Sequence, residues 1–177
     1  EMRNHASGEW FVSDTHCGPL VHARLGIAEG NSGKLVTLIK KKAREIAQEK
    51  GYDLVIVDGS PGTGCPVIAT ISGASLVLVV TEPTVSGIHD LQRVLNLTRH
   101  FNVRAAVCVN KADINPDNVA EIREFCSVNE VPVAGAIPYD MDVTRAQIAG
   151  KSVVEYSSGP AAAEIRKIWE EMKHAVG

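Results

Sequence analysis

The sequence contains few aromatic residues and no closely paired cysteines. Phe, Trp and Tyr make up 5% of the 177 residues, whereas hydrophobic residues together reach 45%. This abundance of Val, Ile, Leu and Ala favours a parallel sheet covered by helices over an aromatic-rich sandwich. The cysteines Cys17, Cys65, Cys108 and Cys126 form no CxxC pair. Their spacing argues against a disulfide scaffold or a cysteine metal site, and it predicts reduced thiols in a cytoplasmic protein.

The chain also lacks a strong charge of one sign and a long apolar run. Its formal net charge is −3, which provides no broad basic field for nucleic acid or for an anionic membrane surface. No apolar run approaches the roughly 20 residues that span a bilayer as a helix. We therefore expect no nucleic-acid partner and no membrane partner.

A complete phosphate-binding loop is missing as well. The stretch "AEGNSGKLV" (28–36) comes close, but the pattern G-x-x-x-x-G-K-[ST] would need Gly at Ala28 and a hydroxyl residue at Leu35. The stretch predicts instead the start of a helix over 32–50, capped by Asn31 or Ser32.

Apolar runs alternate with segments of helical periodicity along the rest of the chain. Continuous apolar runs predict strands, and residues with 3.6-residue spacing predict helices. The predicted strands cover 52–59, 74–83, 103–111 and 131–140, and the predicted helices cover 32–50, 65–73, 86–101, 116–129, 141–149 and 159–175. Residues 1–30 are irregular or form an edge segment, with possible strands at 9–14 and 19–25. This βαβ alternation predicts one α/β domain over 1–177, with a mostly parallel sheet and helices on both faces.

In an open α/β sheet, ligands bind outside the carboxyl ends of the strands. Asp58 follows the first predicted strand and precedes the glycine-rich "GSPGTG", which contains Gly62. The backbone of such a loop can approach phosphate closely, and a neighbouring carboxylate can hold Mg²⁺ through water. A tight turn capped by Asp58 explains the same residues equally well.

Two further strand ends carry polar residues. Asn110 opens "NKAD", where an Asn can pair with a purine edge, and the N-K-x-D spacing matches the guanine-reading pattern in which Asp113 would accept from the base. Pro138 and Asp140 belong to "PYD", which could border a base pocket. All four are candidate nucleotide-binding residues, although a polar turn and a helix cap are the simpler explanations of each motif alone.

In this order, "LVIVDGSPGTG", "LVLVVTEPTVSGIHDLQRV", "VCVNKAD" and "IPYD" resemble the MinD/Mrp/ParA-type P-loop ATPase family over about 52–155. The stretch "GEWFVSDTHCGPLVHARL…NSGKLVTLIKKKA" is similar to a branch with an inserted ferredoxin-like iron–sulfur module. The resemblance implies a Rossmann-like, three-layer P-loop NTPase fold.

The resemblance also implies roles for the strand-end residues. Asp58 would hold the water shell of Mg²⁺ and the Gly62 amide would sense the γ-phosphate, which makes them the candidate catalytic residues. Asn110 would contact adenine, and Pro138 and Asp140 would line the base pocket. The implied cofactors are ATP or ADP with Mg²⁺, and the implied partners are a second copy of the chain and an iron–sulfur or redox protein.

The family's own loop, K-G-G-x-G-K-[ST], would want Lys where Glu29 stands. We therefore expect the chain to be the C-terminal part of a longer ATPase that lacks its phosphate loop and its N-terminal central strand. Any iron–sulfur cluster would belong to a missing inserted domain. Because such a loop supplies most phosphate contacts and the catalytic lysine, the chain alone is predicted to be inactive.

Three other functions fit parts of the pattern. "NKAD" is also found in the related SIMIBI-type GTPases and metallochaperones, where Asp113 would select guanine. A domain similar to cobyrinic acid diamide synthase shares this nucleotide fold, although no glutaminase domain is evident. Without its phosphate loop, the chain could also be a non-catalytic interaction module.

Overall fold

The computed structural model describes residues 8–25 and 32–176 of the chain. It divides into two compact units, Glu1–Gly73 and Ala74–Gly177, and each is described by itself. The predicted single domain over 1–177 stays a prediction. Ala28, Glu29 and Asn31, on which part of the phosphate-loop and helix-cap arguments depends, lie outside the described residues.

The second unit is a parallel α/β sheet with helices on both faces, as predicted. Its strands are β3 (Leu76–Thr81), β4 (Arg104–Asn110) and β5 (Val133–Ile137), in the order β3-β4-β5 and parallel throughout. Its helices are α3 (Val85–His100), α4 (Pro116–Val128), α5 (Met141–Ile148), α6 (Val153–Tyr156) and α7 (Pro160–Val176). Only the short α6 was absent from the sequence prediction for this unit.

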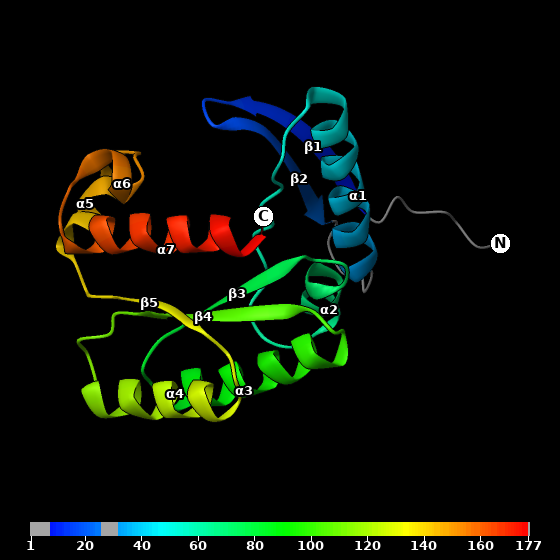
Figure 1. Cartoon of the computed structure of the whole chain (residues 1–177). Coiled ribbons are helices and arrows are strands. Elements are labelled where there is room, and N and C mark those ends of the chain that lie inside the picture. The colour runs from blue at the N-terminus through cyan, green and yellow to red at the C-terminus, as the bar shows by residue number, and fades with distance from the viewer. Residues whose placement is uncertain (1–7, 26–31, 177) are drawn as a thin grey trace. The chain divides into compact units, whose positions relative to one another are not determined.

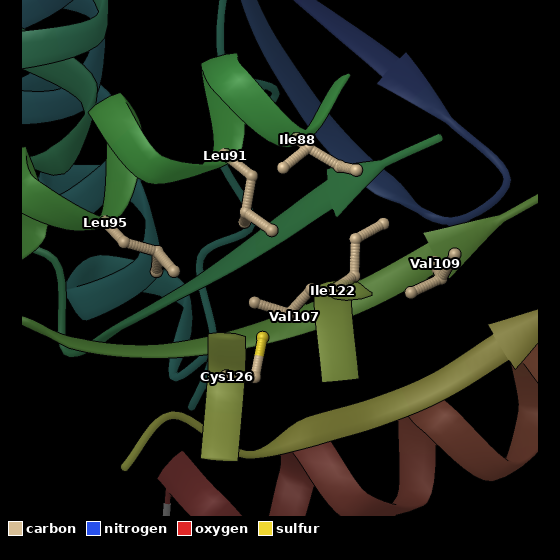
Figure 2. Packing of buried hydrophobic residues seen from close by; sticks show 7 residues of the cluster. All are labelled: Ile88, Leu91, Leu95, Val107, Val109, Ile122 and Cys126. Carbon is tan, nitrogen blue, oxygen red and sulfur yellow. The ribbon is translucent and has the colours of Figure 1, made fainter. Parts of the chain in front are cut away.

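Strand β4 is the centre of the core. One face of the sheet is covered by α3 and α4, and α7 covers the other face (Figure 1). Val107 and Val109 of β4 are 0% exposed and pack with the apolar side chains of α3 and α4. Figure 2 shows this cluster, which comprises Ile88, Leu91, Leu95, Val107, Val109, Ile122 and Cys126. On the opposite face, Ala106 and Cys108 pack with Ala134 and with Ile168 of α7.

The turn from β3 into α3 is held by a side-chain cap and by a glycine. Thr84 Oγ1 accepts from the Gly87 N–H at 3.0 Å, which satisfies one of the free donors at the helix start. A Cβ atom on Gly87 would lie 2.3 Å from the Glu82 carbonyl oxygen. A side chain at position 87 therefore does not fit this turn, which approaches Glu82, the residue that directly follows β3.

The first unit contains a hairpin and two helices. Strands β1 (Gly8–Thr15) and β2 (Gly18–Leu25) pair in antiparallel fashion, which confirms the possible strands at 9–14 and 19–25. Helix α1 (Ser32–Lys50) has the predicted bounds, and α2 (Cys65–Ile71) lies within the predicted 65–73.

One side of α1 differs from the apolar face that its periodicity indicates. Leu38 is 46% exposed, whereas Lys40 is 6% exposed and lies among the buried residues of the helix. The Lys40 ammonium donates to the carbonyl oxygens of Ala69, Thr70 and Ser72 at 2.8, 2.5 and 2.9 Å. The last carbonyls of a helix lack partners within the helix, so this lysine closes the C-terminus of α2.

The predicted strand over 52–59 is wrong. Residues 54–60 have no regular structure, and Ile56 is 74% exposed. A strand is stabilised by hydrogen bonds to a neighbouring strand, and within the described part of the first unit the only strand pair is β1–β2. Apolar composition alone does not supply that neighbour.

Candidate functional site

The carboxyl ends of β3, β4 and β5 lie at one edge of the sheet because all three strands are parallel. The residues that follow them are Glu82, the "NKAD" turn and the "PYD" turn. This is the edge where open α/β sheets bind ligands, and it holds four of the six predicted site residues: Asn110, Asp113, Pro138 and Asp140.

The "NKAD" turn is bonded to the end of β5. The Ala112 N–H donates to the Ile137 carbonyl at 2.9 Å, and the Tyr139 N–H donates to Asp113 Oδ1 at 2.6 Å. These two bonds continue the pairing of β4 and β5 beyond the strands. The structure therefore brings Asp113 against the "PYD" turn, and the carboxylate serves the backbone of that turn.

The same turn is bonded to the end of β3. Lys111 has φ of 53°, a left-handed conformation that is uncommon for a residue with a side chain. Its ammonium lies 2.7 Å from Glu82 Oε1. The "NKAD" turn thus contacts both neighbouring strand ends through Lys111 and Asp113. Asn110, the last residue of β4, is half-buried, and its side-chain amide has no partner among the described residues.

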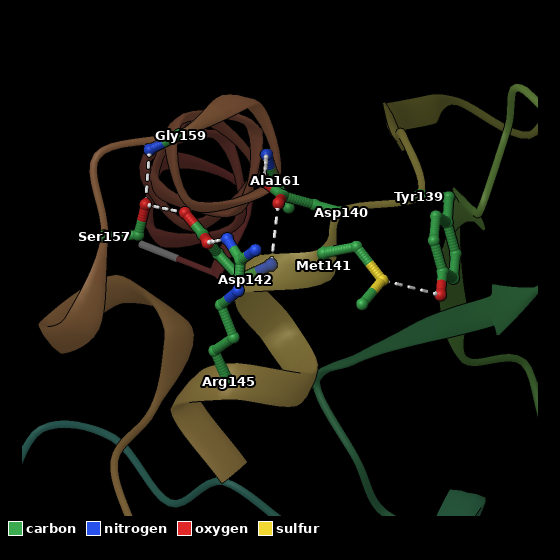
Figure 3. A network of polar contacts seen from close by, with 8 residues as sticks. All are labelled: Tyr139, Asp140, Met141, Asp142, Arg145, Ser157, Gly159 and Ala161. Atoms are coloured by element: carbon green, nitrogen blue, oxygen red, sulfur yellow. Dashed lines mark hydrogen bonds and ion pairs between the residues drawn. The ribbon is translucent and has the colours of Figure 1, made fainter. Parts of the chain in front are cut away.

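Asp140 joins two helix starts. Its Oδ1 accepts from the Asp142 N–H at 2.9 Å at the beginning of α5, and its Oδ2 accepts from the Ala161 N–H of α7 at 3.3 Å (Figure 3). This is the helix-cap alternative that the sequence left open. Its role in a base pocket stays a prediction, as does that of the half-buried Pro138.

A second carboxylate extends this network. The Ser157 hydroxyl donates to Asp142 Oδ2 at 2.7 Å, and Arg145 donates to Oδ1 at 2.9 Å (Figure 3). These bonds favour the charged carboxylate, with the Ser157 bond as the larger cause, and they hold the pKa of Asp142 below its ordinary value. The Gly159 N–H donates in turn to the Ser157 hydroxyl at 2.9 Å. The network fixes the segment between α6 and α7 against α5.

Asp58 and Gly62 belong to the first unit, in the irregular segment that precedes α2. Both are exposed, and Gly62 has φ of 87°, which a residue with a side chain rarely adopts. The N-cap of α2 is Gly64, which has no side chain to cap the helix. The predicted Mg²⁺ and γ-phosphate roles of Asp58 and Gly62 stay predictions.

The described cysteines are free thiols of two kinds. Cys17 and Cys65 are exposed, whereas Cys108 and Cys126 are buried. Burial raises the pKa of Cys108 to about 11, and the nearby Glu164 carboxylate contributes to this. Within residues 8–25 and 32–176, no group of three or more His, Cys, Asp or Glu side chains could hold a metal ion. No helix in the same ranges is long and apolar enough to cross a membrane.

Comparisons with known proteins begin with a negative result: no protein-family model matches the chain. An uncharacterized protein of Methanocaldococcus jannaschii is 31% identical over 158 residues, which cover 89% of the chain and 52% of the relative. A putative septum site-determining protein MinD of Oltmannsiellopsis viridis is 29% identical over 114 residues, or 62% of the chain and 36% of the relative. The MinD cell division protein of Aquifex aeolicus superimposes with a TM-score of 0.70 at 22% identity, covering 92% of the chain and 68% of that structure. The chain is similar in sequence to a MinD protein and shares the fold of a solved MinD structure.

Two more similar proteins have names that mention a ligand or an activity. A cytosolic Fe-S cluster assembly factor Nubp1 homolog of Drosophila grimshawi is 27% identical over 127 residues, or 60% of the chain and 41% of the relative. The MinD of Pyrococcus horikoshii, solved with Mg-ADP, has a TM-score of 0.62 at 18% identity over 83% of the chain and 57% of that structure. The chain spans about half the length of the two Methanocaldococcus jannaschii relatives, 52% of each.

Sequence reasoning missed two features of this edge of the sheet. The Lys111–Glu82 ion pair and the backbone bond to Tyr139 both join segments that are distant in sequence. The sequence did carry a signal for the ion pair, because Glu82 directly follows β3 and Lys111 directly follows β4. The second had no sequence signal, because a backbone N–H carries no residue identity.

Proposed function

We propose that the chain carries the base-binding edge of a MinD/ParA-type ATPase that takes ATP or ADP with Mg²⁺ and acts on a protein partner. The observation that supports this most directly is the pairing of the "NKAD" and "PYD" turns beside the side-chain amide of Asn110, which has no partner within 8–25 and 32–176. An Asn amide can accept from the N6 amino group of adenine and donate to N7. Asn110 is therefore the proposed base contact.

The other roles follow from the family. Pro138 would border the base, and Asp140 would act by fixing the start of α5 next to it. Asp58 offers carboxylate oxygens, the ligand type that Mg²⁺ and its water shell prefer. Gly62 offers a backbone N–H without a side chain to obstruct phosphate. When bound, Mg²⁺ would neutralise charge on the phosphates.

Affinity for nucleotide is expected to be weak in this chain. The 177 residues contain no G-x-x-x-x-G-K-[ST] pattern, and such a loop supplies most phosphate contacts in P-loop NTPases. We therefore propose base binding and not hydrolysis for these residues. Under this proposal, the partner-directed activity belongs to the whole ATPase.

The test is a nuclear magnetic resonance titration of the isotope-labelled 177-residue chain with ADP and Mg²⁺. We expect the backbone amides of 110–113, Tyr139 and Asp140 to shift at millimolar ADP. Asn110→Ala should abolish these shifts, whereas the exposed Asn96→Ala in α3 should leave them unchanged. Shifts confined to other residues, or no shifts at all, would contradict the proposal.

We further propose a second copy of the chain and an iron–sulfur protein as partners. The name of the Drosophila grimshawi relative, an Fe-S cluster assembly factor, supports the second of these. Translational diffusion measured on the same samples tests the first, because a chain that stays monomeric at high concentration with ADP would contradict a homodimer. The proposal of an iron–sulfur partner would be contradicted if no purified candidate iron–sulfur protein changes the nuclear magnetic resonance spectrum of the chain.

A further inference from the structure

The residues of the "NKAD" turn have different partners in this structure, and the partner of Asp113 differs from that in a guanine-reading turn. In a guanine-reading turn, the Asp carboxylate accepts from two donors of the base, N1–H and N2–H. In this chain Asp113 Oδ1 already accepts from the Tyr139 N–H at 2.6 Å, within the range of a strong charge-assisted bond. This bond orients the carboxylate toward the backbone of the neighbouring turn.

The bonds of the two preceding residues also support a structural role for this turn. The Ala112 N–H donates to the Ile137 carbonyl at 2.9 Å, and the Lys111 ammonium lies 2.7 Å from Glu82 Oε1. Both bonds run to the ends of neighbouring strands, as the Asp113 bond does. Among the polar side chains of the motif, only that of Asn110 has no partner in the described part of the chain.

Tyr139, whose backbone N–H donates to Asp113, is exposed to solvent. Its side chain is 51% exposed, and its hydroxyl donates to Met141 Sδ at 3.3 Å (Figure 3). Pro138 and Asp140 flank it, so the bond to this backbone N–H ties the "PYD" turn to the end of β4. Without the Asp113 bond, the Ala112–Ile137 bond would be the remaining hydrogen bond between the two turns among the described residues.

We propose that Asp113 is a positioning residue that fastens the "PYD" turn to the end of β4, and that it does not read the base. Asn110 then remains the base contact, as in the proposed function. The statement about the base rests on the proposed function. The fastening of Tyr139 by Asp113 does not, and it can be measured without nucleotide.

The first experiment measures hydrogen exchange of the Tyr139 amide in the 177-residue chain by nuclear magnetic resonance. Asp113→Ala should speed exchange at least about tenfold, because the acceptor is lost. Asp113→Asn keeps an oxygen that can accept the bond, so its exchange should stay within a few-fold of the original rate. The matched control is Asp117→Ala, an exposed aspartate in the first turn of α4, which should change nothing. Unchanged Tyr139 exchange in Asp113→Ala would overturn the proposal.

The second experiment compares ADP, GDP and XDP with the same variants. A carboxylate that reads guanine can be replaced by Asn with a switch to xanthine, because xanthine presents a carbonyl where guanine presents an amino group. We expect no such switch: Asp113→Asn should bind like the original chain, and Asp113→Ala should weaken all three nucleotides by one common factor. XDP binding gained by Asp113→Asn would overturn the statement about the base. If the unaltered chain binds no nucleotide, the proposed function fails, while the exchange rates still decide the role of Asp113.

Discussion

The first and second units treat similar apolar runs in opposite ways. Residues 107–109 of the second unit form the middle of β4, and Val107 and Val109 are 0% exposed. Residues 54–57 of the first unit are just as apolar but form no strand, and Ile56 is 74% exposed. The second unit gives β4 a parallel neighbour on each edge, whereas the described part of the first unit gives residues 54–57 none. A strand is therefore a property of its neighbours as much as of its own side chains.

The units also differ in the kind of contact that holds their helices. In the second unit, α3 and α4 pack on β4 through a continuous apolar cluster. In the first unit, α1 and α2 are joined by polar bonds from Lys40 and Arg44 to the last carbonyls of α2 and to Gly73. The chain has two tryptophans, Trp10 in the first unit and Trp169 in the second. Variants that keep one tryptophan can therefore report the unfolding of each unit separately.

The largest expected effect comes from two matched isoleucine truncations. Ile122→Ala removes a side chain that is 0% exposed and packed against β4, and it should lower the free energy of unfolding of the second unit by about 2–5 kcal/mol. Ile56→Ala removes one that is 74% exposed, and it should change stability by less than about 0.5 kcal/mol. Urea unfolding followed by the fluorescence of Trp169 and of Trp10 measures both.

This pair can break the comparison between the units. A loss of several kcal/mol in Ile56→Ala would mean that residues 54–57 are packed in solution, as the sequence predicts for a strand. A near-zero effect in Ile122→Ala would show that the second unit lacks the core described here. Either result would remove the contrast on which the correction of the 52–59 strand depends.

The next effect tests the polar closure of α2. Lys40→Met removes an ammonium that donates to three carbonyls, and it should lower the stability of the first unit by about 1–3 kcal/mol. Burial, with a smaller contribution from Arg44, lowers the pKa of Lys40, so charging this group opposes part of the gain from its bonds. The neighbouring Lys41→Met changes an exposed side chain and should have little effect. Urea unfolding followed by Trp10 fluorescence decides, and equal effects of the two variants would contradict a closing role for Lys40.

These cases show how much of the fold could be predicted from sequence. The apolar runs of β3, β4 and β5 and the periodicity of α3, α4 and α7 were sufficient, because each buries its own pattern against an adjacent segment of the chain. Helix α6 was missed although Ser152 and Glu155 form a capping box, the S-x-x-E signal of a helix start. The buried Lys40 was beyond sequence reasoning, because its acceptors are backbone carbonyls that follow about 30 residues later.

The candidate site divides in the same manner. Parallel topology was enough to predict that Asn110, Asp113, Pro138 and Asp140 lie at one edge of the sheet. The partners of the carboxylates were not predictable, because Asp113 and Asp140 bond to backbone N–H groups that any residue could supply. A motif therefore predicts that a side chain lies at an edge of the sheet. Whether that side chain is hydrogen-bonded within the protein depends on the backbone of the neighbouring turns.

The smallest effect concerns the network between α5 and α7. Because the bonds from Ser157 and Arg145 lower the pKa of Asp142 in the folded unit, their stabilisation is fully present above the unfolded pKa of about 3.9. It is lost as the pH falls through the lower, folded pKa. Ser157→Ala removes the larger cause, so the pKa of Asp142 should rise toward its ordinary value and the second unit should lose less stability as the pH falls below about 4. Titration of the Asp142 carboxyl carbon by nuclear magnetic resonance checks the pKa, with the exposed Ser158→Ala as control.

An unchanged Asp142 pKa in Ser157→Ala would show that the Ser157 hydroxyl does not hold this carboxylate. The α6–α7 segment would then depend on its other bonds, such as that from the Ala161 N–H to Asp140 Oδ2.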